Sequence, residues 1–278
     1  MKNVLILDGY NLMHRARSGF MKGDYPVVFN FFRSLKPIVE KFDPDHVAFV
    51  IEGEPKARLE LFPEYKANRE IDEHDEKKRV ELESFHHQKN IIIKMLKEYF
   101  PVAVMRHHNY EADDLIYTIV DRGANDTDYT VVSNDTDFIQ MLNEFDNVEL
   151  YSPTKKEYTD TPQYDYLTWK SLKGDSADNI PGINGIGEKT ATTISQNPEQ
   201  LAEVLNIKEN AEIFSRNVDL IRLHSISENE LAETEISIPK KNWEEVRKKF
   251  EEFEFRSMLK EPYWTKFMST FNSLWEPK

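Results

Sequence analysis

The chain has 278 residues, of which 39% are hydrophobic and 31% are charged. This length can bury one large core, or a main domain and a smaller one. The sequence contains no cysteine, which excludes disulfide bonds and thiolate metal sites and fits a cytoplasmic protein. Its apolar runs are shorter than the roughly 20 residues that a membrane helix needs, and the first run is too short for a secretory signal. We therefore expect no membrane partner.

The formal net charge of −14 at pH 7 bears on possible nucleic-acid partners. Proteins that bind phosphates are usually basic, so this charge argues at first sight against such a partner. The argument weakens if many of the acids belong to a metal site, because bound divalent ions invert the local field. The net charge therefore neither supports nor excludes a nucleic acid.

Short β-branched runs alternate with amphipathic stretches over the first two-thirds of the chain. The runs predict buried strands at Val4 to Leu7, Val47 to Ile51, Val102 to Met105 and Tyr129 to Ser133. The stretches between them predict helices at Val28 to Phe42, Asn90 to Phe100 and Glu111 to Arg122. Strands that alternate with helices indicate an α/β fold, with a mainly parallel central sheet flanked by helices.

The remaining segments suggest how the chain is divided. Between Tyr65 and Lys89 the sequence is too charged for a core and predicts an exposed helix or a mobile loop. After about Tyr151 the strand pattern fades and the chain looks helical, except for a glycine-rich run from Gly174 to Ile194. We therefore expect an α/β domain over residues 1–150 and a helical, DNA-binding subdomain over residues 151–278, with a hairpin motif at 174–194.

Carboxylates stand at the carboxyl ends of all four predicted strands. In chain order they are Asp8, Glu52, the group Glu111, Asp113 and Asp114, and the pair Asp135 and Asp137. In an open parallel sheet such positions converge on one crevice. Crowded acids raise one another's pKa unless cations neutralise them, and oxygen ligands suit Mg²⁺ or Mn²⁺ better than zinc. Two such ions about 4 Å apart can activate a water and stabilise the oxygens of a phosphodiester.

Each of these acids also has an ordinary explanation. Asp8 before Gly9 can make a turn, and acids in the first turn of the helix after Glu111 are favoured by the helix dipole. Asp135 and Asp137 can belong to a solvated loop. The joint placement of all of them at strand ends favours the metal site.

Two basic or glycine-rich segments add to this pattern. The run Gly182 to Lys189 nearly matches a phosphate-binding P-loop, but Glu188 separates Gly187 from the lysine, so the required ending fails. A tight hairpin between two helices fits better, with glycines that let backbone N–H groups approach a phosphate, although a plain helix–turn–helix connector stays open. Lys66 and Arg69 would share a face of a helix and could hold a scissile phosphate.

Five motifs are similar to those of the 5′-3′ exonuclease and flap endonuclease family, which includes the nuclease domains of bacterial DNA polymerase I and the phage flap endonucleases. They are Leu7-Asp8-Gly9-Tyr10-Asn11, Leu61 to Arg69, Glu111-Ala112-Asp113-Asp114, Ser133 to Asp137 and Gly174 to Gly182. Each motif alone is weak, but five in the family's order are specific. As a separate, short chain, the sequence most resembles the phage enzymes.

This resemblance implies a fold and an activity. The fold would be a PIN-like 5′-nuclease sheet with a helical arch at about residues 65–90 and a helix–hairpin–helix element in the helical subdomain. The activity would be hydrolysis of DNA phosphodiesters near junctions of single strand and duplex by a two-metal mechanism. The expected partner is DNA with 5′ ends, flaps or junctions, and a monomer in the cytoplasm of a bacterial or phage-infected cell is expected.

The resemblance also implies the metal ligands. Asp8, Glu52, Glu111 and Asp113 would surround a first ion, with Asp114 bridging or supporting it. The second ion would be surrounded by Asp135, Asp137, Asp175 and Asp178. The ions would be Mg²⁺, for which Mn²⁺ can substitute, and a K⁺ ion can lie at the hairpin.

Contacts with DNA are implied in the same way. Lys66 and Arg69 match a basic pair at the base of the arch, and Arg15 matches a basic position after the first aspartate. The hairpin would bind duplex DNA through Gly182, Gly185, Gly187 and Lys189.

Two positions depart from the family's pattern. The family usually has aspartate where Glu52 stands, and Glu54 is a competing candidate for the same ligand. His14 stands where many relatives have an aromatic residue that stacks on a nucleotide, and an imidazole offers less surface for stacking.

Two rival functions remain. A PIN-type ribonuclease would share the acidic crevice, but the hairpin from Gly174 to Thr190 disfavours it. A non-catalytic relative that binds DNA junctions would gain nothing from negative charge gathered near a phosphate, so the retained acids argue against it.

Overall fold

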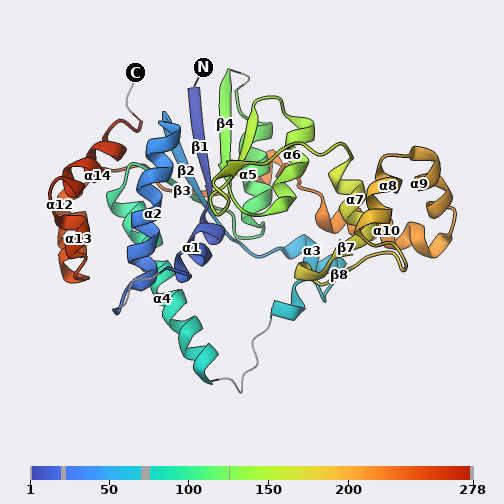
Figure 1. Ribbon diagram of the computed structural model, residues 1–278, viewed down its shortest axis with the longest axis horizontal. Coiled ribbons are helices and arrows are strands. Elements are labelled where there is room, and N and C mark those ends of the chain that lie inside the picture. Colours follow the sequence, from blue (N-terminus) through green and yellow to red (C-terminus); the bar gives the residue numbers. More distant parts are fainter. Residues whose placement is uncertain (1, 20–22, 70–75, 125, 276–278) are drawn as a thin grey trace.

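The computed structural model describes residues 2–19, 23–69, 76–124 and 126–275. Its centre is a seven-stranded sheet (Figure 1). The strand order is β6 (Glu157–Tyr158), β5 (Val148–Ser152), β4 (Thr127–Val132), β1 (Lys2–Asp8), β2 (His46–Ile51), β3 (Ala103–Arg106) and β9 (Glu235–Ile236). Strands β1 to β5 pair in parallel, whereas the two edge strands β6 and β9 are antiparallel to their neighbours.

The central strand β1 is buried on both faces of the sheet. Leu5, Ile6 and Leu7 have no exposed surface, which is why the sequence reads there as a continuous apolar run. The pairing places Asp8 opposite Val50 of β2 and Leu7 opposite Val132 of β4. The carboxyl ends of β1, β2 and β4 therefore lie together at one edge of the sheet.

Helices cover both faces of the sheet, and a separate core fills each side. One core joins the sheet to α1 (Gly9–Arg17), α2 (Pro26–Phe42), α4 (Glu76–Tyr99), α12 (Trp243–Glu252), α13 (Arg256–Leu259) and α14 (Tyr263–Asn272). The other lies under α5 (Ala112–Asp121), α6 (Ile139–Glu144) and α11 (Glu228–Leu231). The expected α/β class with a mainly parallel sheet is confirmed, and the four predicted strands and three predicted helices are all present.

A smaller helical unit lies to one side of the sheet (Figure 1). It contains α3 (Lys56–Leu61), α7 (Tyr166–Lys173), α8 (Glu188–Ser195), α9 (Pro198–Leu205), α10 (Lys208–Ile221) and the strand pair β7 (Gly174–Asp175) and β8 (Ile180–Pro181). Gly174 has a φ of +78°, and a Cβ atom there would lie 2.3 Å from the backbone nitrogen of Gly182. The two glycines therefore let the strands β7 and β8 approach closely.

The packing departs from the expected division at residue 150. β5, β6 and β9 extend the central sheet, and α12 to α14 pack into the first core, where Phe250 and Phe267 are fully buried. The helical unit thus consists of α3 and the segment from α7 to α10, and it does not include the C-terminal helices α12 to α14. The edge strands β6 and β9 are two residues long, too short to show an alternating pattern in the sequence.

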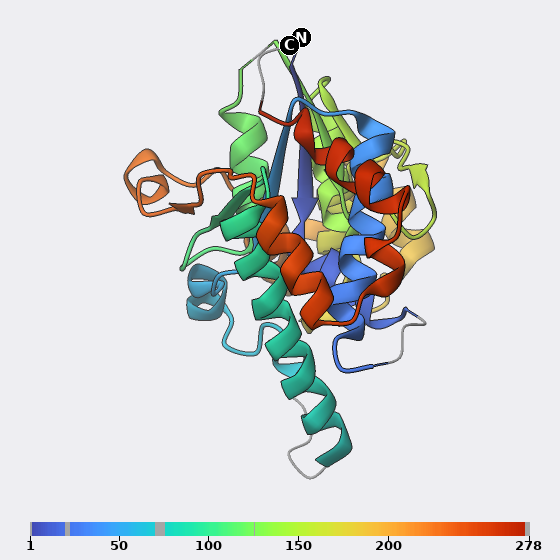
Figure 2. The same ribbon diagram turned by 90° about the vertical axis from the view of Figure 1, so that its left-hand side faces the viewer.

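The charged segment expected as an arch is partly described. It contains the 3₁₀ turn η1 (Ala67–Arg69) and the first turns of α4, a 24-residue helix that extends away from the body of the protein (Figure 2). Residues 70–75 lie outside the described residues. Phe85 and Gln88 of α4 are buried, and Gln88 accepts a hydrogen bond of 2.9 Å from the backbone of Val27, so α4 joins α2 along its second half.

Candidate metal centre

Two carboxylates are fixed by the carboxyl ends of β1 and β2. Asp8 ends β1 and caps α1 by accepting a hydrogen bond of 3.1 Å from the Asn11 backbone. Its second oxygen accepts a hydrogen bond of 2.6 Å from the Ser133 hydroxyl, which follows β4. Glu52, directly after β2, accepts a hydrogen bond of 2.9 Å from the backbone of Ala112, at the start of α5. These bonds join the carboxyl ends of β1 and β4 to each other and the carboxyl end of β2 to the start of α5.

The first group of acids consists of Asp8, Glu52, Glu111 and Asp113. Burial raises the pKa of Asp8 to about 6, with Asp135 adding to the rise. Burial, then the charges of Glu111 and Asp8, raise the pKa of Glu52 to about 7. The pKa of Asp113 is raised well above its ordinary value by burial and then by Asp135, Glu52, Asp8 and Glu111. These carboxylates are therefore crowded enough to repel one another without a bound cation.

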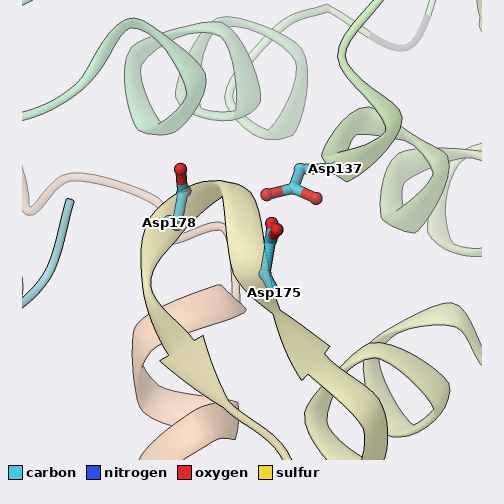
Figure 3. A group of neighbouring side chains, drawn as sticks. All are labelled: Asp137, Asp175 and Asp178. Atoms are coloured by element: carbon cyan, nitrogen blue, oxygen red, sulfur yellow. The ribbon is translucent and has the colours of Figure 1, made fainter. Parts of the chain in front are cut away.

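The second group consists of Asp137, Asp175 and Asp178, whose ligand oxygens all lie within 4.8 Å of one another. Figure 3 shows Asp175 at the end of β7 and Asp178 on the turn that leads to β8, with the Asp137 carboxylate from another segment near Asp175. Burial raises the pKa of Asp137 to about 7, with Asp135 contributing. The charge of Asp135 raises the pKa values of Asp8, Asp113 and Asp137, so Asp135 is near members of both groups and not only the second.

Lysine ammonium groups partly neutralise both groups of acids. The buried Lys170 forms an ion pair with Asp137 and lies 2.7 Å from Asp175. Although burial opposes it, the Lys170 charge keeps the pKa of Asp175 below its usual range. Lys66 pairs with Glu111 and lies 3.7 Å from Asp178, and Arg69 pairs with Asp178. Lys66 therefore stands between the two groups of acids, and Arg69 stands beside the second.

The sequence predicted that Lys66 and Arg69 share one face of a helix, and this prediction is wrong. Lys66 has a φ of +59° and precedes η1, and its backbone N–H donates a hydrogen bond of 2.9 Å to the carbonyl of Asp178. The loop, not a helix, brings the two cations to the acids.

Asp114 differs from the other predicted ligands. Both of its oxygens accept hydrogen bonds from Arg58, at 2.5 and 2.8 Å, and the backbone of His224 donates a third bond of 3.2 Å. Arg58 thus already balances the charge of Asp114. The structure therefore favours a supporting role for Asp114 over direct binding of a metal ion. Between the two competing glutamates, the structure favours Glu52, because Glu54 is exposed and Glu52 faces the acids.

The predicted DNA-binding residues lie around the acids, since Arg15 lines a cavity together with Asp135, and Gly187 lines one together with Asp137, Asp175 and Asp178. A Cβ atom at Gly182 would lie 2.2 Å from the backbone of Lys173, whereas Gly185 and Gly187 have open space beside them. Gly187 precedes α8, and Lys189 lies in the first turn of that helix. Arg15 lines a cavity next to α1 and α2. His14 packs its ring between Tyr10 and Phe85, with centroid distances of 4.4 and 4.6 Å.

Sequence reasoning missed several residues that shape the site: Arg58, Tyr65, Ser133 and Lys170. Arg58 donates a hydrogen bond of 2.9 Å to Glu111, and the Tyr65 hydroxyl bonds Glu111 at 3.0 Å and Asp178 at 3.2 Å. Arg58, Tyr65 and Ser133 stand in or beside quoted motifs, so the need of buried acids for partners could have indicated them. Nothing in the local pattern around Lys170 marks it.

The donors fit a divalent metal. The acids of both groups offer carboxylate oxygens, the ligands that Mg²⁺ and Mn²⁺ prefer, and burial and neighbouring acids raise the pKa values of Asp8, Glu52 and Asp137, so positive charge would stabilise their ionised forms. A carboxylate centre at the carboxyl edge of a parallel sheet fits a metal-dependent enzyme that acts on phosphate esters, such as a nuclease.

The comparisons with known proteins identify the family. The family model described as "5′-3′ exonuclease, N-terminal resolvase-like domain" matches residues 3–167, so the chain belongs to the 5′-3′ exonuclease family. This confirms the family predicted from the five motifs. The chain is 27% identical over 293 residues to a 5′-3′ exonuclease of Aquifex aeolicus (strain VF5), covering 94% of this chain and 95% of that protein.

Two further comparisons agree. A 5′-3′ exonuclease of Bacillus subtilis (strain 168) is 32% identical over 225 residues, covering 73% of this chain and 72% of the relative. The fold is similar to the bacteriophage T5 flap endonuclease in a complex with DNA and metal ions, with a TM-score of 0.67, 23% identity and coverage of 80% of this chain and 89% of that chain. None of the helices that the structure describes has the length and apolar character of a membrane span.

Proposed function

We propose that this chain is a structure-specific 5′ nuclease that hydrolyses DNA phosphodiesters near junctions of single strand and duplex. One observation carries the proposal: acids from distant segments form two adjoining groups, with the Lys66 ammonium between Glu111 and Asp178. Binding of DNA alone would gain nothing from carboxylates beside a phosphate. A catalytic metal centre accounts for the acids and the cation together.

The proposed cofactor is Mg²⁺, with two ions, and Mn²⁺ can substitute because it prefers the same oxygen ligands. The first ion would be held by Asp8, Glu52, Glu111 and Asp113, and the second by Asp135, Asp137, Asp175 and Asp178. When bound, such ions supply an activated water and stabilise the attacking and leaving oxygens of the phosphodiester. A K⁺ ion at the hairpin belongs to the same proposal, because the backbone around Gly185 and Gly187 is open to approach.

The chain's own side chains prepare the centre for substrate. Ser133 fixes Asp8, and Arg58 and Tyr65 fix Glu111, so the carboxylates are oriented by neighbours rather than by substrate. Lys66 would meet a phosphate that enters between the two groups of acids. Its positive charge would then offset the negative charge that develops during cleavage.

The hairpin would hold the duplex part of the substrate. The amino end of α8 carries unpaired backbone N–H groups, and Gly187 leaves them accessible. Contacts of this kind bind the phosphate backbone without reading bases. The proposed partner is therefore DNA with 5′ ends, flaps or junctions, which the protein recognises by shape. We propose that the protein binds it as a monomer, in the cytoplasm of a bacterial or phage-infected cell.

A time course with an end-labelled 5′-flap DNA tests the proposal. We expect product near the junction in Mg²⁺ and none in EDTA, and the product lengths give the polarity of cleavage. Asp113→Asn should abolish cleavage while circular dichroism shows a folded protein. Asp121→Asn, at the exposed end of the same helix, is the matched control and should cleave normally.

Other outcomes would contradict the proposal. Normal turnover of the Asp113→Asn variant in Mg²⁺ would show that the proposed metal centre takes no part in the reaction. Mg²⁺-dependent binding without any cut would favour a non-catalytic junction binder, and faster cleavage of single-stranded RNA than of flap DNA would favour a PIN-type ribonuclease.

A further inference from the structure

The central sheet ends at β9, and the outer edge of this strand exposes apolar side chains. β9 is the last strand in the strand order, and among the described residues it pairs only with β3. Ile236 and Ile238 are 58% and 78% exposed, and neither belongs to the metal centre or the hairpin. We call the outer side of residues 235–240 the β9 edge. An uncovered sheet edge with apolar side chains is a place where another strand can pair.

The backbone of the β9 edge has hydrogen-bond donors that face away from the protein. The N–H group of Ser237 donates a hydrogen bond of 2.9 Å to the carbonyl of Val104 in β3. Successive residues of an extended chain turn their N–H groups to opposite sides, so the N–H groups of Ile236 and Ile238 face away from β3. The pattern ends at Lys240, whose N–H group turns back and bonds the body of the protein. The open edge therefore suits a short extended peptide better than a second sheet.

The exposed isoleucines of the β9 edge continue an existing core. Ile236 lies opposite Met105 of β3, and residues directly opposite each other in an antiparallel pair share one face of the sheet. Met105 packs against the second core, under α5, α6 and α11. Apolar residues of an added strand would therefore lie beside Ile236 and Ile238 and extend that core past β9. The bound strand should carry apolar residues at alternate positions.

The two ends of the β9 edge differ in charge. At one end, Glu235 lies 3.0 Å from the His108 ring and 3.8 Å from the Lys97 ammonium. The exposed Glu233 precedes it. At the other end, the side chain of Lys240 is exposed and forms no ion pair with any described residue. An acidic residue of an added strand would be attracted near Lys240 and repelled near Glu233, so the charges favour a partner segment that is acidic at one end.

We propose that the β9 edge binds an extended segment of a partner protein as an additional antiparallel strand, with apolar residues beside Ile236 and Ile238 and an acidic residue near Lys240. Antiparallel pairing is slightly more stable per residue than parallel pairing. The main-chain hydrogen bonds would provide affinity, and the alternate side chains would provide selectivity. The inference goes beyond the proposed function, because the β9 edge contributes no side chain to the metal centre or the hairpin. Another protein could hold the nuclease there while the metal centre stays open to DNA.

Fluorescence anisotropy with the full chain and labelled peptides tests the proposal. The first probe is Asp-Asp-Val-Thr-Val-Thr with blocked ends, whose valines would lie opposite the two isoleucines in the antiparallel register. The second probe, Thr-Val-Thr-Val-Asp-Asp, has the same composition but would place its acids near Glu233. We expect saturable binding of the first probe and about fivefold weaker binding of the second. The first probe with N-methylated valines should bind about tenfold more weakly or worse, because those N–H groups would donate to the carbonyls of Ile236 and Ile238.

Variants of the protein locate the binding site. Ile236→Ser/Ile238→Ser should weaken binding of the first probe by about tenfold or more, because the apolar contacts are lost. Lys240→Gln should weaken it by about threefold to fivefold. The matched controls are Ile207→Ser and Lys208→Gln in the helical unit, where Ile207 is 57% exposed and the Lys208 side chain is 91% exposed. Both controls should bind like the wild type, and all four variants should keep the Tm of the wild type.

Several results would overturn the inference. One is the absence of saturable binding of the first probe at concentrations up to about 1 mM, which corresponds to a very weak complex. Another is equal affinity for the reversed or the N-methylated probe, and a third is an equal loss in the Ile207→Ser control. Sedimentation analysis gives a fourth: wild-type dimers that disappear in Ile236→Ser/Ile238→Ser would mean that a second copy of the chain covers the β9 edge. None of these measurements depends on cleavage, so their failure would leave the proposed function standing.

Discussion

Arg58 and Asp114 form a buried ion pair in which the guanidinium donates hydrogen bonds of 2.5 and 2.8 Å to the two carboxylate oxygens. The same guanidinium donates to the carbonyls of Leu220, at 2.8 Å, and Arg222, at 3.1 Å. Arg58 also bonds Glu111 of the first acid group. One side chain therefore joins the metal centre to the carboxyl end of α10 in the helical unit.

Arg58→Met should destabilise the protein by roughly 3–5 kcal/mol, because it leaves the Asp114 charge buried without a partner. Urea denaturation would measure the loss. The double variant Arg58→Met/Asp114→Leu should recover part of it, because the Asp114 charge is then no longer left buried without its partner. If the double variant is no more stable than Arg58→Met, the unpaired charge of Asp114 is not the cause of the destabilisation.

Lys66→Ala should lower the rate of flap cleavage by about 100-fold or more, because the ammonium would no longer meet the charge that develops on the phosphate. The affinity for duplex DNA should change much less. Single-turnover kinetics and binding isotherms separate the two effects. The exposed Lys56 of α3 provides the control Lys56→Ala, which should cleave normally. A loss of affinity that equals the loss of rate would refute a role in the transition state.

The metal-free protein should become less stable as the pH rises from about 4 to 7. The pKa values of Asp8, Glu52 and Asp137 are raised by burial to about 6, 7 and 7, so the folded state binds more protons than the unfolded state between about pH 4 and pH 7. The free energy of unfolding should therefore fall as the pH rises through this window. Asp175 has a lowered pKa, but its contribution is lost only at lower pH. Burial lowers the pKa of His14 to about 4, which acts in the opposite direction, but it is one group against three.

Thermal melts in EDTA at pH 5.5 and pH 8 would measure this effect. Tm should be lower at pH 8, and Mg²⁺ should remove most of the difference, because the ions bind the deprotonated carboxylates. Asp113→Asn should raise Tm in EDTA at pH 8, since it removes one of the repelling charges. A Tm in EDTA that is higher at pH 8 than at pH 5.5 would contradict the raised pKa values of these acids in the folded protein.

The sequence predicted the parts of this protein that follow from local patterns. The fully buried run Leu5 to Leu7 marks β1, and Asp8 at its end marks the edge where the acids gather. The sequence did not reveal the partners of those acids. Lys170 meets Asp137 across 33 positions and Arg58 meets Asp114 across 56, and no periodicity encodes contacts at such separations. The packing of α12 to α14 against α2 escaped prediction for the same reason.

Two glycine substitutions in the hairpin should separate folding from DNA binding. In Gly182→Ala the added methyl group would lie 2.2 Å from the backbone of Lys173, so we expect a lower Tm. In Gly187→Ala nothing lies within 4 Å of the added methyl group, and φ is −90°, so Tm should change little. That methyl group would stand at the amino end of α8, so it should still weaken duplex binding. Displacement of one charge-assisted contact to a phosphate would lower the affinity about tenfold. Fluorescence anisotropy would measure this loss. Unchanged duplex affinity in Gly187→Ala, with Tm preserved, would mean that the duplex does not approach the backbone at this point.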